Sequence, residues 1–242
     1  MPEKRLIEFN PQPRIERVDL GNGQSCFVID DALMNPERLV QFAVDRRIDF
    51  RMVDYNAYPG LLLPTPGEIS EKLNAFFIEN IRGMFDVRRI ASMHSRLAMV
   101  TLQPESLRPY QRVCHSDNFQ IDGRHSLQAS VLYLFNDTSL GGTSFYYSKM
   151  APHEMLQLFD DAAAMSNAQF TQRHGVQPGY LCETNRYFHR IARVEAKWNR
   201  LIFYDGALLH SGDIAAPEKL SADPAVGRLT LNGFFTSRRH AA

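Results

Sequence analysis

The sequence predicts an α+β protein that is mainly β, with helices near the N-terminus and strands after them. Apolar residues recur at helical spacing before residue 85, and short apolar runs separated by turn residues follow. Many short strands of this kind are typical of a sandwich or a barrel. With 242 residues, no internal repeat and no low-complexity run, we expect a single domain over residues 1–242.

The segment from about residue 14 to 85 is expected to form a helical layer that supports the strands. One helix is predicted over residues 30–47, with Asn35 as N-cap and Pro36 at the first helical position. A second helix is predicted over residues 66–85, where apolar side chains recur near the 3.6-residue period.

Three further stretches complete this N-terminal part. Residues 24–33, QSCFVIDDAL, read as a short buried strand. The polar residues 1–13 are expected to lie loosely on the surface. Residues 54–67 hold three Pro and two Gly and predict a loop.

Residues from about 86 to 238 are expected to form the strand-rich core. Apolar or alternating runs predict strands at 97–102, 127–135, 143–147, 179–191, 193–196, 200–204, 207–212 and 227–237. Asp205-Gly206 predicts a two-residue hairpin turn. The Ala-, Met- and Gln-rich residues 151–174 predict a helical insertion, which is either a lid or a packed flank.

Composition argues against several classes of partner. Lys and Arg together number 27, equal to Asp and Glu, so no global field attracts nucleic acid or an anionic membrane. The three Cys form no C-x-x-C, which fits reduced thiols and a cytoplasmic location. The N-terminus has no apolar signal region, and no run of 18 apolar residues exists, so we expect no membrane association.

The chain holds a single His-x-Asp, at His115 and Asp117, a pair that composition alone could produce by chance. On a strand, residues two apart face the same side, so both side chains would point together. His210 closes the later run ALLH and is the best third ligand. Two His and one carboxylate with open positions describe a non-haem Fe(II) oxygenase site.

Arg228 and Thr230 begin the next strand and share one face. A guanidinium binds a carboxylate through two parallel hydrogen bonds, and a neighbouring hydroxyl can add a third. A dicarboxylate such as 2-oxoglutarate could therefore chelate the metal at one end and contact Arg228 and Thr230 at the other.

With these motifs the sequence resembles the Fe(II)/2-oxoglutarate-dependent oxygenases, closest to the prolyl-hydroxylase-like branch. The resemblance runs from about Leu97 to Ser237 through the segments LAMVTLQP, HSDN, LYLFN…LGGTSFY, NRLIFYDGALLHSG and GRLTLNGFF, in the order of the family. It implies a double-stranded β-helix core of the jelly-roll or cupin kind.

The resemblance also implies roles and cofactors. His115, Asp117 and His210 would be the iron ligands. Arg228, with Thr230 and Tyr133, would bind the far carboxylate of 2-oxoglutarate. The implied activity is a dioxygenase that uses Fe(II), 2-oxoglutarate and O2, with ascorbate as a potential reductant. Hydroxylation of an unactivated C–H bond would accompany formation of succinate and CO2.

Two departures from the family pattern stand out. Gln103 lies where prolyl hydroxylases can carry a pocket Tyr. The 18 residues from His210 to Arg228 exceed the usual spacing, and residues 213–227 read as a loop insertion. Lys219 in this loop is an alternative cation for the co-substrate but a poorer anchor.

The other histidines are weaker candidates. His125, His153, His174 and His189 have no ligand-like partner at fixed spacing and are expected to be structural or to lie at the surface. His94 and Arg96 alternate on the strand before the His-x-Asp motif and either reach the substrate or are structural.

Two rival functions stay open at this point. One is a non-catalytic metal- or ligand-binding module with the same fold, and the other is a two-His-one-carboxylate enzyme that does not use 2-oxoglutarate. No feature of the sequence names the substrate, which could be an amino acid, a peptidyl residue, a sugar or another small metabolite. The oligomeric state is equally open, a homodimer being one option.

Overall fold

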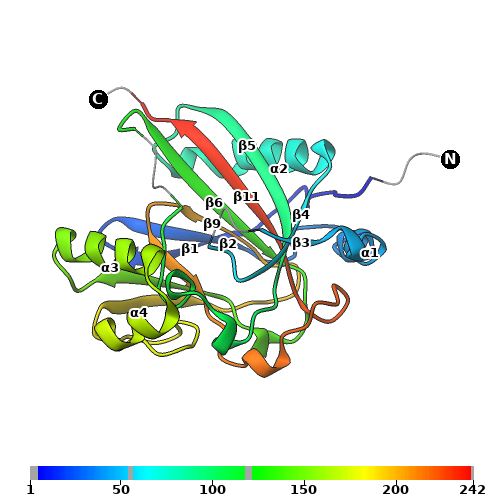
Figure 1. The fold of residues 1–242 in the computed structure, drawn as a ribbon. Coiled ribbons are helices and arrows are strands. Elements are labelled where there is room, and N and C mark those ends of the chain that lie inside the picture. The colour runs from blue at the N-terminus through cyan, green and yellow to red at the C-terminus, as the bar shows by residue number, and fades with distance from the viewer. Residues whose placement is uncertain (1–4, 54–56, 118–121, 241–242) are drawn as a thin grey trace.

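Two antiparallel β-sheets form the centre of the computed structural model, which describes residues 5–53, 57–117 and 122–240. The larger sheet has the strand order β1-β2-β9-β6-β11-β5-β4-β3, and the smaller has the order β10-β7-β8 (Figure 1). The strands are β1 (Ile15–Gly21), β2 (Gln24–Ile29), β3 (Arg51–Met52), β4 (Gly60–Pro64), β5 (Arg89–Val100), β6 (His125–Tyr133), β7 (Thr143–Ser148), β8 (Phe188–Val194), β9 (Leu201–Asp205), β10 (Leu209–Gly212) and β11 (Arg228–Arg238). The prediction of a mainly β protein with accompanying helices is confirmed, and both sheets prove to be antiparallel.

Four α-helices lie in the described residues, with short 3₁₀ helices in the connections. The α-helices are α1 (Glu37–Asp45), α2 (Gly67–Asn80), α3 (Pro152–Ala164) and α4 (Asn167–His174). The 3₁₀ helices are Arg47–Asp49, Arg82–Met84, Pro104–Ser106, Pro109–Gln111, Thr138–Leu140 and Pro217–Lys219. No helix in the described ranges is long and apolar enough to cross a membrane.

Three apolar clusters hold the layers together. Between α1, α2 and one face of the larger sheet, Leu73 and Phe77 pack with Phe235, and the Phe77 and Phe235 rings stack at 4.2 Å. A second cluster fills the space between the sheets, and a third joins α3 and α4 to the smaller sheet through residues such as Phe170 and Phe188. The molecule is therefore layered as helices, large sheet, small sheet and helices.

The segment 14–85 is less helical than predicted, because β1, β2, β3 and β4 belong to the larger sheet. The predicted loop 54–67 contains β4, whose three consecutive leucines pair with β5. Pro64 is tolerated because it ends the strand, next to the two-residue edge strand β3. The predicted strand at 24–33 and both helices are present, although Pro36 is the N-cap of α1 rather than its first residue.

The N-terminal stretch also differs from the prediction of a loose surface segment. Ile7 is only 1% exposed, and the Phe9 ring stacks on Phe76 at 4.4 Å. Two apolar residues therefore tie an otherwise polar segment to the helical face of the larger sheet. Residues 1–4 of this stretch lie outside the described residues.

Two strand predictions in the core need correction. The predicted strand 179–191 begins only at Phe188, and the residues before it form an irregular loop with bends. Asp205-Gly206 is not a hairpin turn, because it links β9 in the larger sheet to β10 in the smaller. A type I′ turn needs positive φ, which Gly206 does not adopt.

Candidate metal centre and its cavity

His115 and His210 are held side by side by their own backbones. His115 N–H donates to the His210 carbonyl at 3.0 Å, and His210 N–H donates to the His115 carbonyl at 2.8 Å. His210 lies on β10, so this bridge adds the His115 segment to the exposed edge of the smaller sheet. Two residues on, Asp117 N–H donates to the Gly206 carbonyl at 2.7 Å.

The three predicted ligands meet at one point. One ligand atom from each of His115, Asp117 and His210 lies within 4.8 Å of the other two. His115 Nε2 is 3.7 Å from Asp117 Oδ1, and His210 Nε2 is 3.5 Å from Asp117 Oδ2. These separations are within roughly 1 Å of those between neighbouring ligands of one octahedral ion.

The surroundings of the two imidazoles favour the neutral form that binds metals. His210 Nδ1 lies 2.8 Å from the Leu208 carbonyl, a contact that places the proton on Nδ1 and leaves the Nε2 lone pair free. Desolvation in the cavity and, second, the adjacent imidazole of His210 lower the pKa of His115 to about 4. His115 is therefore neutral near pH 7, and the donor set of two imidazoles and one carboxylate suits a divalent transition metal.

A cavity of about 390 Å³ opens on the three ligands. Arg228 and Thr230, the predicted co-substrate residues on β11, line the same cavity. Both are buried, with Arg228 4% exposed. The sheet that carries Arg228 and the sheet edge that carries the candidate metal ligands thus share one interior space.

The Arg228 guanidinium is anchored from one side. Its Nε donates to the carbonyls of Leu140 and Gly141 at 3.0 Å each, and its Nη2 donates to Gly142 at 2.8 Å. Tyr58 lines the same cavity and interacts with Arg228 and Thr230, and burial, the largest influence, raises the pKa of its phenol. Arg228, Thr230 and Tyr58 therefore form one polar group in the cavity wall.

Tyr133 lies close to this group but does not line the cavity. Its hydroxyl bonds to Thr143 Oγ1 at 2.8 Å, and Thr143 lines the cavity in its place. Burial raises the Tyr133 pKa to about 12, so the phenol stays protonated. Tyr133 therefore borders the cavity through Thr143, and its contact with the co-substrate stays a prediction.

The other candidate residues divide into two groups. Arg96 lines the cavity, and His94 stacks at 5.0 Å on Phe234, which also lines it. Gln103 donates to the Pro217 carbonyl at 3.0 Å, and Lys219 lies 3.3 Å from Asp137, both outside the cavity lining. Lys219 is therefore not an alternative anchor.

The remaining histidines and the helical insertion also lie away from the candidate metal ligands. His125 pairs with Asp122, His174 with Asp161, and His189 contacts Thr184, while His153 borders a different hollow. No residue of 151–174 lines the cavity; α3 and α4 pack against the smaller sheet instead. This placement matches the packed flank rather than the lid.

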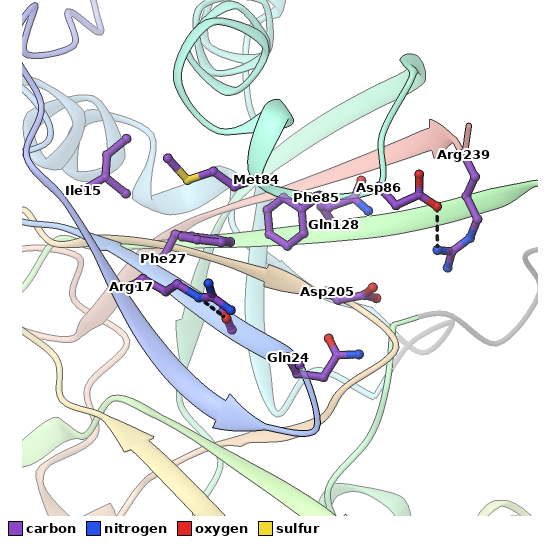
Figure 2. Close-up of a pocket in the computed structure, with 12 residues that line it drawn as sticks. Ile15, Arg17, Gln24, Phe27, Met84, Phe85, Asp86, Gln128, Asp205 and Arg239 are labelled. Carbon is purple, nitrogen blue, oxygen red and sulfur yellow. Dashed lines mark hydrogen bonds and ion pairs between the residues drawn. The ribbon is translucent and has the colours of Figure 1, made fainter. Parts of the chain in front are cut away.

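A larger cavity, of about 550 Å³, lies elsewhere, between β1, β2 and the turn after α2 (Figure 2). Arg17 donates to Ser25 at 2.7 Å, and Asp86 pairs with Arg239 at 3.7 Å, so charged residues in its wall are already partnered. It holds none of the three clustered ligands. Chemistry, rather than size, identifies the smaller cavity as the candidate site.

Two site residues escaped the sequence reasoning. Tyr58 lies far from every motif, in a Pro- and Gly-rich stretch, and no sequence signal singles it out. Asn232 lines the cavity and is two residues beyond Thr230 on the same strand. The two-residue period that linked Arg228 to Thr230 could therefore have found Asn232.

The chain belongs to the family described as "Family of unknown function (DUF6445)", whose model matches residues 11–235. A search of curated proteins found no significant match.

Among solved structures, it is similar to a Pseudomonas putida prolyl-4-hydroxylase, at 15% identity and a TM-score of 0.42 over 85% of this chain and 86% of that one. HygX from Streptomyces hygroscopicus, solved with nickel, 2-oxoglutarate and hygromycin B, gives 11% identity and a TM-score of 0.43 over 90% and 84%. The epimerase SnoN, in complex with Fe3+, alpha ketoglutarate and nogalamycin RO, gives 11% identity and a TM-score of 0.46 over 89% and 81%.

Proposed function

We propose that this protein is an Fe(II)- and 2-oxoglutarate-dependent oxygenase that hydroxylates an unactivated C–H bond of a small-molecule or peptidyl substrate. One observation carries the proposal. His115, Asp117 and His210 converge in the wall of a cavity that the buried Arg228 also lines. Three facial ligands and a buried guanidinium in one cavity are what a chelating dicarboxylate requires.

The residues of the chain have distinct parts in this proposal. His115, Asp117 and His210 would hold the iron, with the Leu208 carbonyl orienting His210. Arg228, Thr230 and the Tyr58 hydroxyl would bind the far carboxylate of 2-oxoglutarate. When bound, iron and 2-oxoglutarate supply the oxidising chemistry, with succinate, CO2 and a hydroxylated product as the outcome.

We further propose that β5 to β11 form a double-stranded β-helix. Support comes from the alternation of the strands between two facing sheets: β5, β6, β9 and β11 lie together in one, and β7, β8 and β10 lie in the other. The His115–His210 bridge supplies a fourth member to the smaller sheet. In such a core the ligands sit at the open end of the strands.

The direct test is succinate formation from 2-oxoglutarate by the purified protein with Fe(II), O2 and ascorbate, with and without candidate substrates. We expect wild-type protein to form succinate and His115→Ala to lose both succinate formation and metal binding. His125→Ala is the matched control, because His125 pairs with Asp122 outside the cavity and should change neither.

Two outcomes would favour the rival functions. Metal and 2-oxoglutarate binding without any turnover across a broad substrate panel would indicate a binding module. Turnover with Fe(II) that ignores 2-oxoglutarate would indicate a different oxygenase class. Tyr58→Phe and Thr230→Val probe the co-substrate subsite more cleanly than Arg228→Ala, since Arg228 also bonds three backbone carbonyls.

A further inference from the structure

We infer that Arg96 and Asn232 bind the head group of the substrate, and that this head group is a carboxylate with an N–H or O–H donor beside it on an otherwise apolar molecule. The inference rests on the proposed function for the place of 2-oxoglutarate. Arg96 on β5 and Asn232 on β11 are direct partners in the strand register. Side chains paired in this way lie on the same face, with Cβ atoms about 5 Å apart.

Asp117 is the only carboxylate that lines the cavity in the described part of the chain, and it pairs with the two histidines rather than with Arg96. Arg96 lines the cavity, and its buried Nε has no hydrogen-bond partner among the described residues. Its guanidinium lies 4.8 Å above the Phe234 ring, which orients the flat group without neutralising it. A buried donor left unmatched in this way is costly, so a ligand acceptor is the expected partner.

The charges in the cavity show which ligand would complete it. A divalent metal and Arg228 on one side are balanced by Asp117 and the two carboxylates of 2-oxoglutarate on the other. Arg96 is then the positive charge that remains in a partly desolvated space, and a substrate with one negative group would neutralise it. Arg96 lines the same cavity as His115 and Asp117, so this charge shares the space that the proposed metal ligands enclose.

Asn232 adds a second requirement. It is 9% exposed, lines the cavity, and its buried Oδ1 accepts no hydrogen bond from the described residues. An acceptor of this kind needs an N–H or O–H from the ligand. Because Arg96 and Asn232 are register partners, the donor must be close to the carboxylate, as in an N-acylated amino acid or a 2-hydroxy acid.

The rest of the cavity suits an apolar body. Val113, Val131, Leu181, Ile214 and Phe234 all line it. A molecule that places its acid on Arg96 would therefore extend an apolar portion past the metal ligands. This portion would carry the reacting C–H bond.

The test uses protein loaded with Mn(II) and 2-oxoglutarate without oxygen, and measures binding by calorimetry. The probes are N-acetyl derivatives of apolar L-amino acids, their carboxamides, which lack the charge, and their N-methyl forms, which lack the N–H. We expect wild-type protein to prefer the acid over the carboxamide and the N–H form over the N-methyl form.

The variants assign each preference to one residue. Arg96→Gln should weaken acid binding roughly ten- to hundred-fold and abolish the preference over carboxamides, as expected for loss of a charge-assisted pair. Arg96→Lys should retain part of the acid binding and part of the preference over carboxamides. Asn232→Leu should remove only the preference for the N–H form. Arg89→Gln, an exposed arginine on the same strand, is the control and should match wild-type protein.

Three results would overturn the inference. The first is equal binding of acids and carboxamides by wild-type protein, and the second is no binding of any acid. The third is loss of 2-oxoglutarate affinity in Arg96→Gln, which would assign Arg96 to the co-substrate. Failure of wild-type protein to bind Mn(II) and 2-oxoglutarate would instead contradict the proposed function. In that case, the preference for acids over carboxamides, and its loss in Arg96→Gln, would be measured with the metal-free protein.

Discussion

Gly206 holds Asp117 in place, and its replacement by alanine should weaken metal binding. A Cβ on Gly206 would lie 2.5 Å from Leu127 Cδ2, 3.1 Å from the Leu127 carbonyl oxygen and 3.2 Å from Asp117 Cβ. The Leu127 methyl can rotate away, but the other two atoms belong to or adjoin the backbone. Gly206 cannot retreat either, because it bonds to Leu127 and to Asp117 at 2.7 Å each.

The expected size of the effect follows from these contacts. Overpacking a closed site typically costs about 1–3 kcal/mol, which lowers Tm by about 2–12 °C in a protein of this size. Displacing a residue that supports a metal ligand weakens metal affinity by about 10- to 100-fold. We expect Gly206→Ala to bind Mn(II) about tenfold more weakly than wild-type protein, the smaller loss of that range, because the clash with Asp117 is only a few tenths of an ångström.

Calorimetric titration with Mn(II), alongside thermal unfolding, separates the two effects. Gly83→Ala is the matched control, since nothing lies within 4 Å of a Cβ at that position. Ala43→Gly in α1, outside the cavity lining, lowers stability by about 1–2 kcal/mol through helix propensity and loss of a buried methyl, and shows what destabilisation alone does to metal affinity. Unchanged Mn(II) affinity in Gly206→Ala, or a loss matched by Ala43→Gly, would refute the reasoning.

Three further predictions follow from named contacts. Tyr58→Phe removes a cavity hydroxyl that interacts with Thr230 and Arg228, and it should raise the Kd for 2-oxoglutarate about fivefold, or about 1 kcal/mol, with Mn(II) affinity unchanged. A calorimetric value equal to wild type would contradict this. Thr143→Val leaves the buried Tyr133 hydroxyl unpaired and should cost about 1–3 kcal/mol by denaturant unfolding, whereas Thr143→Ser should retain stability. Hydrogen bonding to Arg200 lowers the Asp30 pKa to about 2. Because the pKa of Asp30 in the unfolded chain is about 4, wild-type protein should have its full stability advantage over Asp30→Asn above that pH. That difference in Tm should shrink as pH falls toward 2, and a constant difference between pH 7 and pH 2 would exclude the ion pair as its cause.

Features that depend on the spacing of apolar residues along the chain could be predicted from the sequence, whereas features that depend on tertiary contacts could not. The apolar spacing of α2 and the alternation in β11 appear in the sequence as they do in the structure. By contrast, β4 was predicted as a loop because its prolines and glycine outweighed three leucines, yet pairing with β5 decides its conformation. Asp205-Gly206 has the residues of a hairpin turn, but Gly206 is needed because the backbone passes Leu127 and Asp117 too closely for a side chain.

The candidate site likewise combines residues that the spacing along one strand predicts with a residue that only the fold brings there. Arg228, Thr230 and Asn232 are spaced two residues apart on β11 and all line the cavity, each step advancing about 7 Å. Co-substrate and substrate would therefore lie in sequence along β11, with 2-oxoglutarate at Arg228 and the substrate head group at Asn232. Arg96 completes the second subsite from β5, because the antiparallel register sets it opposite Asn232. Periodicity on β11 is readable from the chain, whereas the partner on β5 depends on a register that only the folded sheet establishes.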